Sequence, residues 1–224
     1  MVRLEHVSKI YPVGKGKLIV LNDVSINIKK GEMVAIMGPS GSGKTTTLNL
    51  IRCLDRPTSG SYFLDGREVG RLSSRDLAQV RGEKIGFIFQ TFNLLSRLTA
   101  LANVELGMTY AGGVDHRRAL EALAKVGLSQ RVKHRPLELS GGEQQRVAIA
   151  RAIAKDPSLF LCDEPTGQLD SHSGHEVMTI LTSLHDERGI TVVVVTHDAD
   201  IASHCQRIIH FRDGQVVDEE TPSR

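Results

Sequence analysis

A run of eight residues with three glycines, a lysine and a threonine could bind phosphate. Residues 38–45, GPSGSGKT, match the pattern G-x-x-x-x-G-K-[ST], in which successive backbone N–H groups surround a polyphosphate. The short apolar run 33–37 before it is typical of a buried strand, and a predicted helix with a positive N-terminal end follows it. A glycine-rich turn without this function would not need these flanks. The sequence therefore predicts a nucleoside triphosphate site.

Each residue type in this loop has an expected contribution. Lys44 places a positive charge beside the β- and γ-phosphates, and the Thr45 hydroxyl is predicted to coordinate Mg²⁺. Thr46 is expected to add a further hydroxyl contact. Alone, these residues predict an NTPase but do not select its class. The glycines that allow the backbone to turn its N–H groups inward are Gly38, Gly41 and Gly43.

Two adjacent carboxylates follow another apolar run. Residues 159–162 are predicted to form a buried strand, so Asp163 lies at the carboxyl edge of the sheet, beside the glycine-rich loop. There Asp163 is predicted to hold Mg²⁺, and Glu164 is the candidate general base for the water that attacks the γ-phosphorus. Asp-Glu-Pro is also typical of a strand-to-turn junction. The presence of the glycine-rich loop favours the catalytic interpretation.

A further helix begins with residues suited to an anion. Residues 139–147, LSGGEQQRV, place Ser140 and two glycines at the start of a helix with a continuing apolar face. The structural alternative is a serine-capped core helix, but capping does not need two glycines. Two phosphate-binding helix ends in one chain indicate a nucleotide held from both sides, once by each of two subunits. The sequence thus predicts an ATP-bridged homodimer.

The elements that position these residues follow from hydrophobic periodicity. Residues 2–30 alternate apolar and polar side chains and predict an antiparallel sheet. Between residues 94 and 127 the apolar spacing is near 3.6, which predicts a helical region. The acidic residues 218–220 are expected to be a solvated tail. Four apolar runs separated by helical stretches predict a mainly parallel α/β core: residues 85–89, 159–162, 191–195 and 208–211.

Composition narrows the classes of function. The 224 residues suit one domain with a subdomain, and a net charge of +2 from 28 basic and 26 acidic residues favours no nucleic-acid partner. Three scattered cysteines predict neither a disulfide framework nor a zinc site, which suits a reducing cytoplasm. We expect no signal peptide, and the apolar stretch 190–195 is far below the roughly 20 residues that cross a bilayer.

With these motifs the sequence resembles the ATP-binding cassette ATPases over essentially its whole length. The resemblance depends on the Walker A loop at residues 38–45, the Leu-Ser-Gly-Gly signature at 139–142, Asp163-Glu164-Pro165 and Thr196-His197-Asp198, in the family's order. It implies a single α/β domain over residues 1–224, with a P-loop NTPase core. Its implied divisions are a core with an N-terminal antiparallel β subdomain, at about residues 1–93 and 158–224, and a helical subdomain with the signature, at about 94–157.

The resemblance also implies roles for individual residues. Gln90 matches the loop that contacts both Mg²⁺ and the membrane-facing side, and His197 matches the switch that contacts the γ-phosphate. Tyr11 matches the aromatic residue that stacks on adenine, although it could instead pack on the β-rich sheet. A buried, hydrogen-bonded core histidine is the alternative for His197. Two further loop positions match residues beside the phosphates: Ser40 and Ser42.

The signature is implied to reach the nucleotide of the opposing subunit. Ser140 and Gly142 match the positions that do so, and residues 167–170 match a loop at the dimer contact. Glu143 replaces the usual Gln at the next nucleotide-side position, and Gln168 replaces a more frequent Ala or Asn. Because Glu143 adds negative charge near a polyphosphate, we expect it to weaken nucleotide binding across the dimer.

The implied function is ATP hydrolysis that powers transmembrane permease subunits, from a cytoplasmic position on the inner face of the cell membrane. Several runs look most like the group that performs lipoprotein release or macrolide and peptide export. A cell-division-type ATPase that regulates a cell-wall enzyme without transport is the alternative that the sequence leaves open. DNA-repair and translation cassettes are disfavoured because the chain has no long heptads and no second Lys-bearing loop. A GTPase is disfavoured because no Asn-Lys-x-Asp element is present.

Overall fold

The computed structural model describes residues 1–14, 16–109 and 111–222. These residues form an antiparallel sheet with strand order β2-β1-β4-β5. Its inward side chains, such as Val2, Leu4 and Ile28, are buried while their neighbours are exposed, as the alternation predicted. The antiparallel sheet expected for residues 2–30 is confirmed, and two strands that follow were not predicted. The strands are β1 (Val2–Val13), β2 (Gly16–Ile28), β4 (Ser59–Leu64) and β5 (Arg67–Glu68).

The second sheet has the order β10-β9-β3-β8-β7-β6 in the described residues, and all neighbouring pairs except β10 with β9 are parallel. The inner strands are continuous apolar runs because both faces of the sheet are covered. The predicted mainly parallel core is therefore confirmed. Its strands are β3 (Met33–Met37), β6 (Ile85–Ile88), β7 (Leu159–Asp163), β8 (Thr191–Val195), β9 (Arg207–Arg212) and β10 (Gln215–Glu220).

The acidic C-terminal segment is not the solvated tail that the sequence predicted. Residues 218–220 belong to β10, which pairs antiparallel with β9. Glu219 accepts a hydrogen bond from Arg207 at 2.7 Å, and Glu220 lies 3.0 Å from His210 across the strands. Cross-strand pairs of opposite charge support such an edge strand, whose side chains stay exposed.

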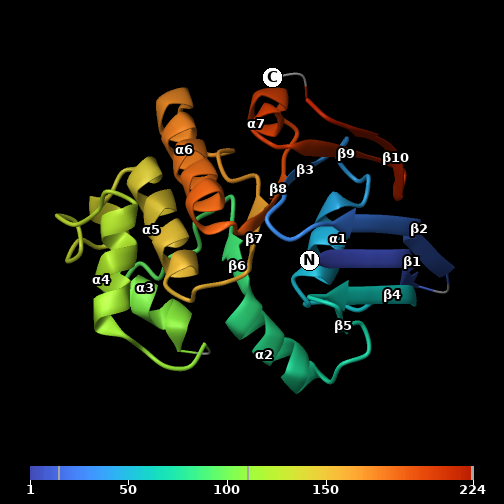
Figure 1. Cartoon of the computed structure of the whole chain (residues 1–224), viewed down its shortest axis with the longest axis horizontal. Helices are drawn as coiled ribbons and strands as arrows, with labels where there is room; N and C mark the ends of the chain where they lie inside the picture. Colours follow the sequence, from blue (N-terminus) through green and yellow to red (C-terminus); the bar gives the residue numbers. More distant parts are fainter. Residues whose placement is uncertain (15, 110, 223–224) are drawn as a thin grey trace.

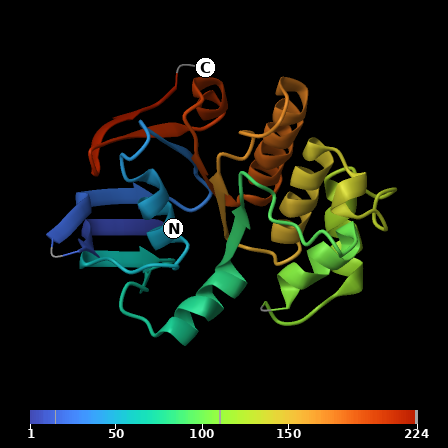
Figure 2. The ribbon, with the colours of Figure 1, turned by 180° about the vertical axis from the view of Figure 1, so that it is seen from behind.

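The helices lie on both sides of the parallel sheet. Figures 1 and 2 show α3, α4 and α5 together on the side of the molecule away from the antiparallel sheet. The helical region predicted for residues 94–127 contains α3 and α4. Helix bounds are α1 (Lys44–Ile51), α2 (Ser74–Lys84), α3 (Ala100–Met108), α4 (His116–Lys125), α5 (Gly141–Ile153), α6 (Ser171–Arg188) and α7 (Ala199–Ser203), with the 3₁₀ turn η1 (Pro136–Glu138). Among the described residues no helix combines the length and apolar character needed to cross a membrane.

Two hydrophobic clusters occupy the two faces of the parallel sheet. Alternate residues of one strand enter different clusters, as Ala35 and Val34 do in β3. One cluster joins the sheet to α3, α4, α5 and α6. The other joins it to α1 and to the antiparallel sheet. Because the sheet is held on both faces, the carboxyl ends of β3, β7 and β8 form a fixed edge for the site.

Candidate active site

The glycine-rich loop connects β3 to α1, as the sequence predicted. A Cβ atom on Gly38 would lie 2.2 Å from the Phe211 carbonyl oxygen and 2.8 Å from Ser42 Oγ, so only glycine fits there. Gly43 has φ +102°, and a Cβ atom would lie 2.6 Å from Leu21 Cδ2. These close approaches fix the loop directly before the N-terminus of α1.

Lys44 is held at the mouth of the loop by the loop itself. Its ammonium group donates to the carbonyl oxygens of Gly38 and Pro39, at 2.6 and 2.9 Å. Lys44 is also the first residue of α1, so its charge adds to the positive helix end. The arrangement concentrates positive potential at the mouth of the loop.

One cavity of about 670 Å³ gathers most of the predicted residues. It brings the loop of residues 38–45 together with residues from the ends of β6, β7 and β8, which lie far apart in the sequence. Val20, Pro39 and Val195 also line it, although the sequence did not single them out. The predicted residues that line it are Gly38, Ser40, Gly41, Gly43, Lys44, Thr45, Thr46, Gln90, Asp163, Glu164 and His197. The predicted residues that do not line it are Tyr11, Ser42, Ser140, Gly142 and Glu143.

The Ser42 side chain is buried behind the backbone of the loop. It is 2% exposed, and its hydroxyl has no hydrogen-bond partner among the described residues. Its backbone N–H donates to the Pro39 carbonyl at 3.2 Å, and its carbonyl accepts from the Gly214 N–H at 3.0 Å. Ser42 therefore supports the loop from the side of β9 and β10.

Asp163 ends β7 at the cavity and is half-buried. Burial is the main cause that raises the pKa of Asp163, and the neighbouring Glu164 carboxylate raises it further. The positive charges of Arg52 and Lys44 act in the opposite direction. Asp163 is thus a carboxylate whose ionised form is disfavoured until a cation reaches it.

Glu164 is held by two donors in an uncommon backbone conformation. Its φ is +47°, in the left-handed region where non-glycine residues store strain. One carboxylate oxygen, Oε2, accepts from the Thr196 hydroxyl at 3.3 Å. The other, Oε1, lies 2.8 Å from Nδ1 of His197. The carboxylate is consequently aimed into the cavity from a strained turn.

His197 is not a buried core histidine. Its side chain is 74% exposed, and it follows the end of β8. The hydrogen bond with Glu164, and then the charge of Glu164, raise the pKa of His197. The alternative weighed from the sequence is therefore excluded, and His197 is free to reach a ligand in the cavity.

Replacement of Asp163 by Asn is expected to stabilise the nucleotide-free protein. The folded-state pKa of Asp163 is raised above its unfolded value of about 3.9. The protonated Asp163 side chain therefore makes its full contribution to stability below the unfolded-state pKa. This contribution is lost as the pH rises through the folded-state pKa. At neutral pH the ionised carboxylate costs stability, so we expect Asp163→Asn to raise the thermal midpoint by about 2–4 °C.

Thermal unfolding in the absence of nucleotide, from acidic to neutral pH, measures this effect. The difference in thermal midpoint between Asp163→Asn and the unmodified protein should disappear toward acidic pH. Glu187→Gln, at an exposed position of α6 with no ion pair among the described residues, is the control and should show no such difference. An Asp163→Asn midpoint at or below that of the unmodified protein at neutral pH would contradict the expectation.

Tyr11 lies beside the cavity rather than in its lining. Its hydroxyl donates to Asp55 at 2.6 Å, and the Lys9 ammonium lies 4.8 Å from the centre of its ring. Partial burial, together with Asp55, raises the pKa of Tyr11 to about 12. These contacts fix the tyrosine on β1, so its stacking on adenine stays a prediction.

The start of α5 is a capping box. The Ser140 hydroxyl accepts from the Glu143 N–H at 3.2 Å, and the Glu143 carboxylate accepts from the Ser140 N–H at 2.9 Å. A Cβ atom on Gly142 would lie 2.8 Å from Ser173 Oγ, so this glycine also has a packing role. Ser140, Gly142 and Glu143 are not among the residues that line the cavity.

Gln145 is a residue that the sequence reasoning missed. It is fully buried, and its side-chain amide donates to the carbonyl oxygens of Phe89 at 3.1 Å and Pro165 at 2.5 Å. These carbonyls directly precede Gln90 and follow Glu164, so α5 is tied to both segments. A signal was present in the sequence, because a polar residue at position 145 falls on the buried stripe of residues 148, 149 and 152.

Gln90 and its loop are held by further contacts. A Cβ atom on Gly167 would lie 2.8 Å from the Gln90 side-chain nitrogen, so Gln90 rests against that backbone. From α5, Arg151 donates to the carbonyl oxygens of Phe92 and Asn93 at 3.0 and 2.6 Å. The loop that follows β6 is thereby fastened to the signature helix.

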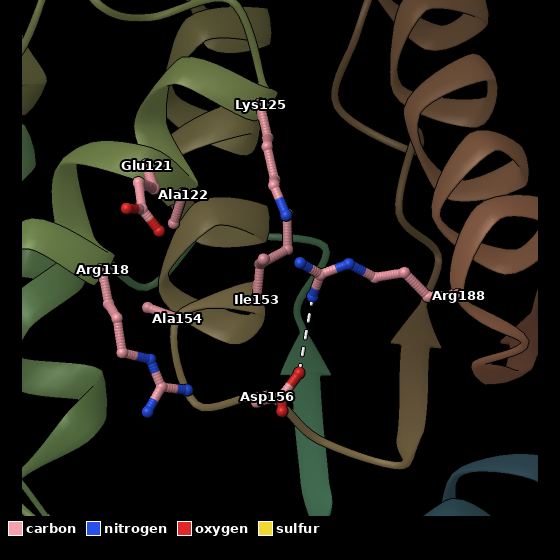
Figure 3. Close-up of a pocket in the computed structure, with 8 residues that line it drawn as sticks. All are labelled: Arg118, Glu121, Ala122, Lys125, Ile153, Ala154, Asp156 and Arg188. Atoms are coloured by element: carbon pink, nitrogen blue, oxygen red, sulfur yellow. Dashed lines mark hydrogen bonds and ion pairs between the residues drawn. The ribbon is translucent and has the colours of Figure 1, made fainter.

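Smaller cavities lie outside the active site, and two of them adjoin α5. One, of about 250 Å³, lies between α4, the end of α5 and the end of α6, and contains the ion pair of Arg188 with Asp156 at 3.4 Å (Figure 3). The other, of about 210 Å³, is a groove beside the Gln90 loop. Neither is lined by a predicted site residue. The groove is lined by Phe87, Phe89, Asn93, Gly107, Arg151, Ala152 and Lys155.

Comparison with known proteins places these features in context. A family model described as ABC transporter matches residues 21–167. The macrolide export ATP-binding/permease protein MacB 1/2 of Paracoccus denitrificans is 52% identical over 220 residues, or 97% of this chain and 33% of that protein. The uncharacterized ABC transporter ATP-binding protein MJ0796 of Methanocaldococcus jannaschii is 49% identical over 227 residues, or 98% of this chain and 97% of that protein.

Solved structures agree in fold. The dimeric structure of a post-hydrolysis state of the ATP-binding cassette MJ0796, bound to ADP and Pi, has a TM-score of 0.91 at 48% identity and covers 100% of both chains. The chain spans about a third of the length of the macrolide-export relatives that it matches.

Proposed function

Because this chain belongs to the ABC transporter family, we propose that it is an ATP-hydrolysing subunit that closes with a second copy around two ATP molecules and drives a membrane-spanning partner. The observation that carries the proposal is the one cavity that gathers the loop of residues 38–45 with Gln90, Asp163, Glu164 and His197. These residues supply phosphate contacts, metal ligands, a base and a γ-phosphate contact, which are the groups that phosphoryl transfer to water requires.

Mg²⁺ is the metal that this donor set fits. The Thr45 hydroxyl, the Gln90 amide and the Asp163 carboxylate line the same cavity and offer the hard oxygen ligands that Mg²⁺ prefers. Burial that raises the pKa of Asp163 also fits, because a desolvated carboxylate gains most from a cation. When bound, Mg²⁺ would offset the negative charge of the β- and γ-phosphates.

The remaining residues bind ATP and prepare the water for attack. Lys44 exchanges its two loop carbonyls for phosphate oxygens and keeps its charge beside them. Glu164 takes a proton from the attacking water, and Thr196 and His197 hold its two oxygens toward the cavity. The exposed ring of His197 also contacts the γ-phosphate and orients it while it keeps its bond to Glu164.

The second copy supplies the other half of each ATP site. Ser140 and Gly142, at the N-terminus of α5, lie outside the cavity of their own chain and would face the nucleotide bound by the partner copy. The dimer of the ATP-binding cassette MJ0796, bound to ADP and Pi, supports this arrangement. In the proposed cycle the helical subdomain, residues 94–157, moves against the core, residues 1–93 and 158–224, as ATP enters and leaves.

The membrane-spanning partner is proposed to dock at the groove beside the Gln90 loop. The groove combines the aromatic rings of Phe87 and Phe89 with the basic residues Arg151 and Lys155, next to the loop that senses the nucleotide. The related MacB proteins are named ATP-binding/permease proteins and support a permease partner. Macrolide or peptide export, or lipoprotein release, from the cytoplasmic face of the membrane is the proposed role.

Phosphate release by the purified chain tests the proposal. Because each ATP site needs two copies, we expect specific activity to rise with protein concentration and to disappear when Mg²⁺ is chelated. Chains that hydrolyse ATP equally well at every concentration, down to where only monomers exist, would contradict the two-copy site. No phosphate release with Mg²⁺ at any concentration would contradict autonomous hydrolysis.

A further inference from the structure

An ion pair stands directly behind the capping box of α5. Arg131, in the segment between α4 and η1, donates from Nε to Glu143 Oε1 at 3.0 Å. The other oxygen of the same carboxylate accepts from the Ser140 N–H at 2.9 Å. One carboxylate thus connects the Arg131 guanidinium to the backbone of the serine that is proposed to face ATP.

The pair matters because the carboxylate is ionised. The Ser140 N–H is the main cause that lowers the pKa of Glu143, and Arg131 lowers it further. An ionised Glu143 places a negative charge at a helix start that is proposed to attract a polyphosphate. The neighbouring Arg146 donates to Glu176 on α6, so Arg131 is the cation that pairs directly with Glu143.

We propose that Arg131 is a positioning residue of the signature: it neutralises Glu143 and keeps its carboxylate on the Ser140 N–H, so that the start of α5 still attracts the ATP of the second copy. The inference rests on the proposed two-copy site. It revises the expectation that Glu143 simply weakens nucleotide binding, since the charge of Glu143 is matched within the chain.

The net charge of the Arg131–Glu143 pair predicts how readily ATP drives dimerisation of each variant. The pair is neutral in the unmodified chain. Glu143→Gln leaves one positive charge, and Arg131→Ala leaves one negative charge. The double variant, which combines Arg131→Ala with Glu143→Gln, is neutral again. Gln also completes a capping box, so Glu143→Gln preserves the helix start. ATP should therefore drive dimerisation most readily in Glu143→Gln and least readily in Arg131→Ala. The unmodified pair and the double variant should lie between them and behave alike.

The experiment measures the ATP concentration that gives half-maximal dimer in the Glu164→Gln background, by light scattering with Mg²⁺. At about 0.05 M salt we expect Arg131→Ala to raise this concentration by about three- to tenfold, and the double variant to return it to within about twofold. Arg117→Ala removes a cation that is paired with Glu121 on the exposed face of α4 and should change nothing.

Salt separates an electrostatic role from a structural one. At about 0.5 M salt the differences should shrink, because the Arg131 side chain is exposed and salt screens its charge. The inference would be overturned if Arg131→Ala dimerised with the same ATP dependence as the unmodified pair. It would also be overturned if the double variant needed as much ATP as Arg131→Ala. Either result would leave the two-copy site intact. No ATP-driven dimer in any variant would instead remove the two-copy site and the inference with it. Fluorescent ATP binding to the monomers, equal in all variants, checks that the chain's own cavity is intact.

Discussion

Glu164→Gln is expected to lower ATP hydrolysis by about 10²–10⁴-fold while leaving ATP binding nearly unchanged. Gln keeps the shape of the side chain and can still pair with Thr196 and His197, but it cannot take a proton from water. The carboxylate that it replaces is aimed into the cavity by two hydrogen bonds, at 3.3 and 2.8 Å. Phosphate release measures the loss, and equilibrium binding of ATP checks the retained affinity.

A matched variant separates the role of this carboxylate from a change in overall charge. Glu187→Gln, near the exposed end of α6, removes the same charge far from the cavity and should hydrolyse ATP at the unmodified rate. Hydrolysis by Glu164→Gln within a few-fold of the unmodified rate would show that another group accepts the proton. The left-handed backbone at Glu164 would then need a different explanation.

Lys44→Ala is expected to weaken ATP binding by about 100-fold or more. The variant removes the ammonium group that is held at the mouth of the loop, together with its bonds to Gly38 and Pro39. Charge-assisted hydrogen bonds to phosphate are among the strong polar contacts of proteins, and 100-fold corresponds to about 2.7 kcal/mol. Calorimetric titration with ATP and Mg²⁺ measures the change.

The control for Lys44→Ala lies at the opposite end of β3. Lys30 is exposed in the turn before this strand, and Lys30→Ala should bind ATP as the unmodified chain does. If Lys44→Ala kept its affinity but lost hydrolysis, Lys44 would act only in the transition state. That result would remove the role in ground-state binding assigned to it here.

The parts of the fold that the sequence predicted are those with a strong local pattern. The loop of residues 38–45, its strand and its helix are contiguous, so spacing alone locates them. The apolar strands β7 and β8 are buried on both faces and are equally plain in the sequence. The short strand β5 has two residues and no alternation to reveal it, so it could not be predicted.

The parts that could not be predicted depend on contacts between distant residues. Glu219 and Glu220 read as a charged tail, yet β9 pairs with them and supplies Arg207 and His210. Tyr11 meets Asp55, which is 44 positions away. Pairing of this kind is set by tertiary structure, which hydrophobic periodicity does not report.

The same limit applies within the candidate site. From the sequence, Glu143 is an added negative charge, and only the structure shows that Arg131, 12 positions earlier, is its partner. Gln145 differs, because its place on the buried stripe of α5 could have been noticed. A polar residue on an apolar helix face is therefore worth testing as a link between elements whenever it precedes or follows a proposed ligand site.

The two-sided ATP site is tested most directly by the molar mass of Glu164→Gln in solution, measured by size-exclusion chromatography with light scattering. Without nucleotide we predict the mass of one 24.5 kDa chain, and with Mg²⁺ and ATP we predict a doubling that ADP does not produce. A single-chain mass in both conditions, with ATP binding demonstrated in the same sample, would contradict the site built from two copies.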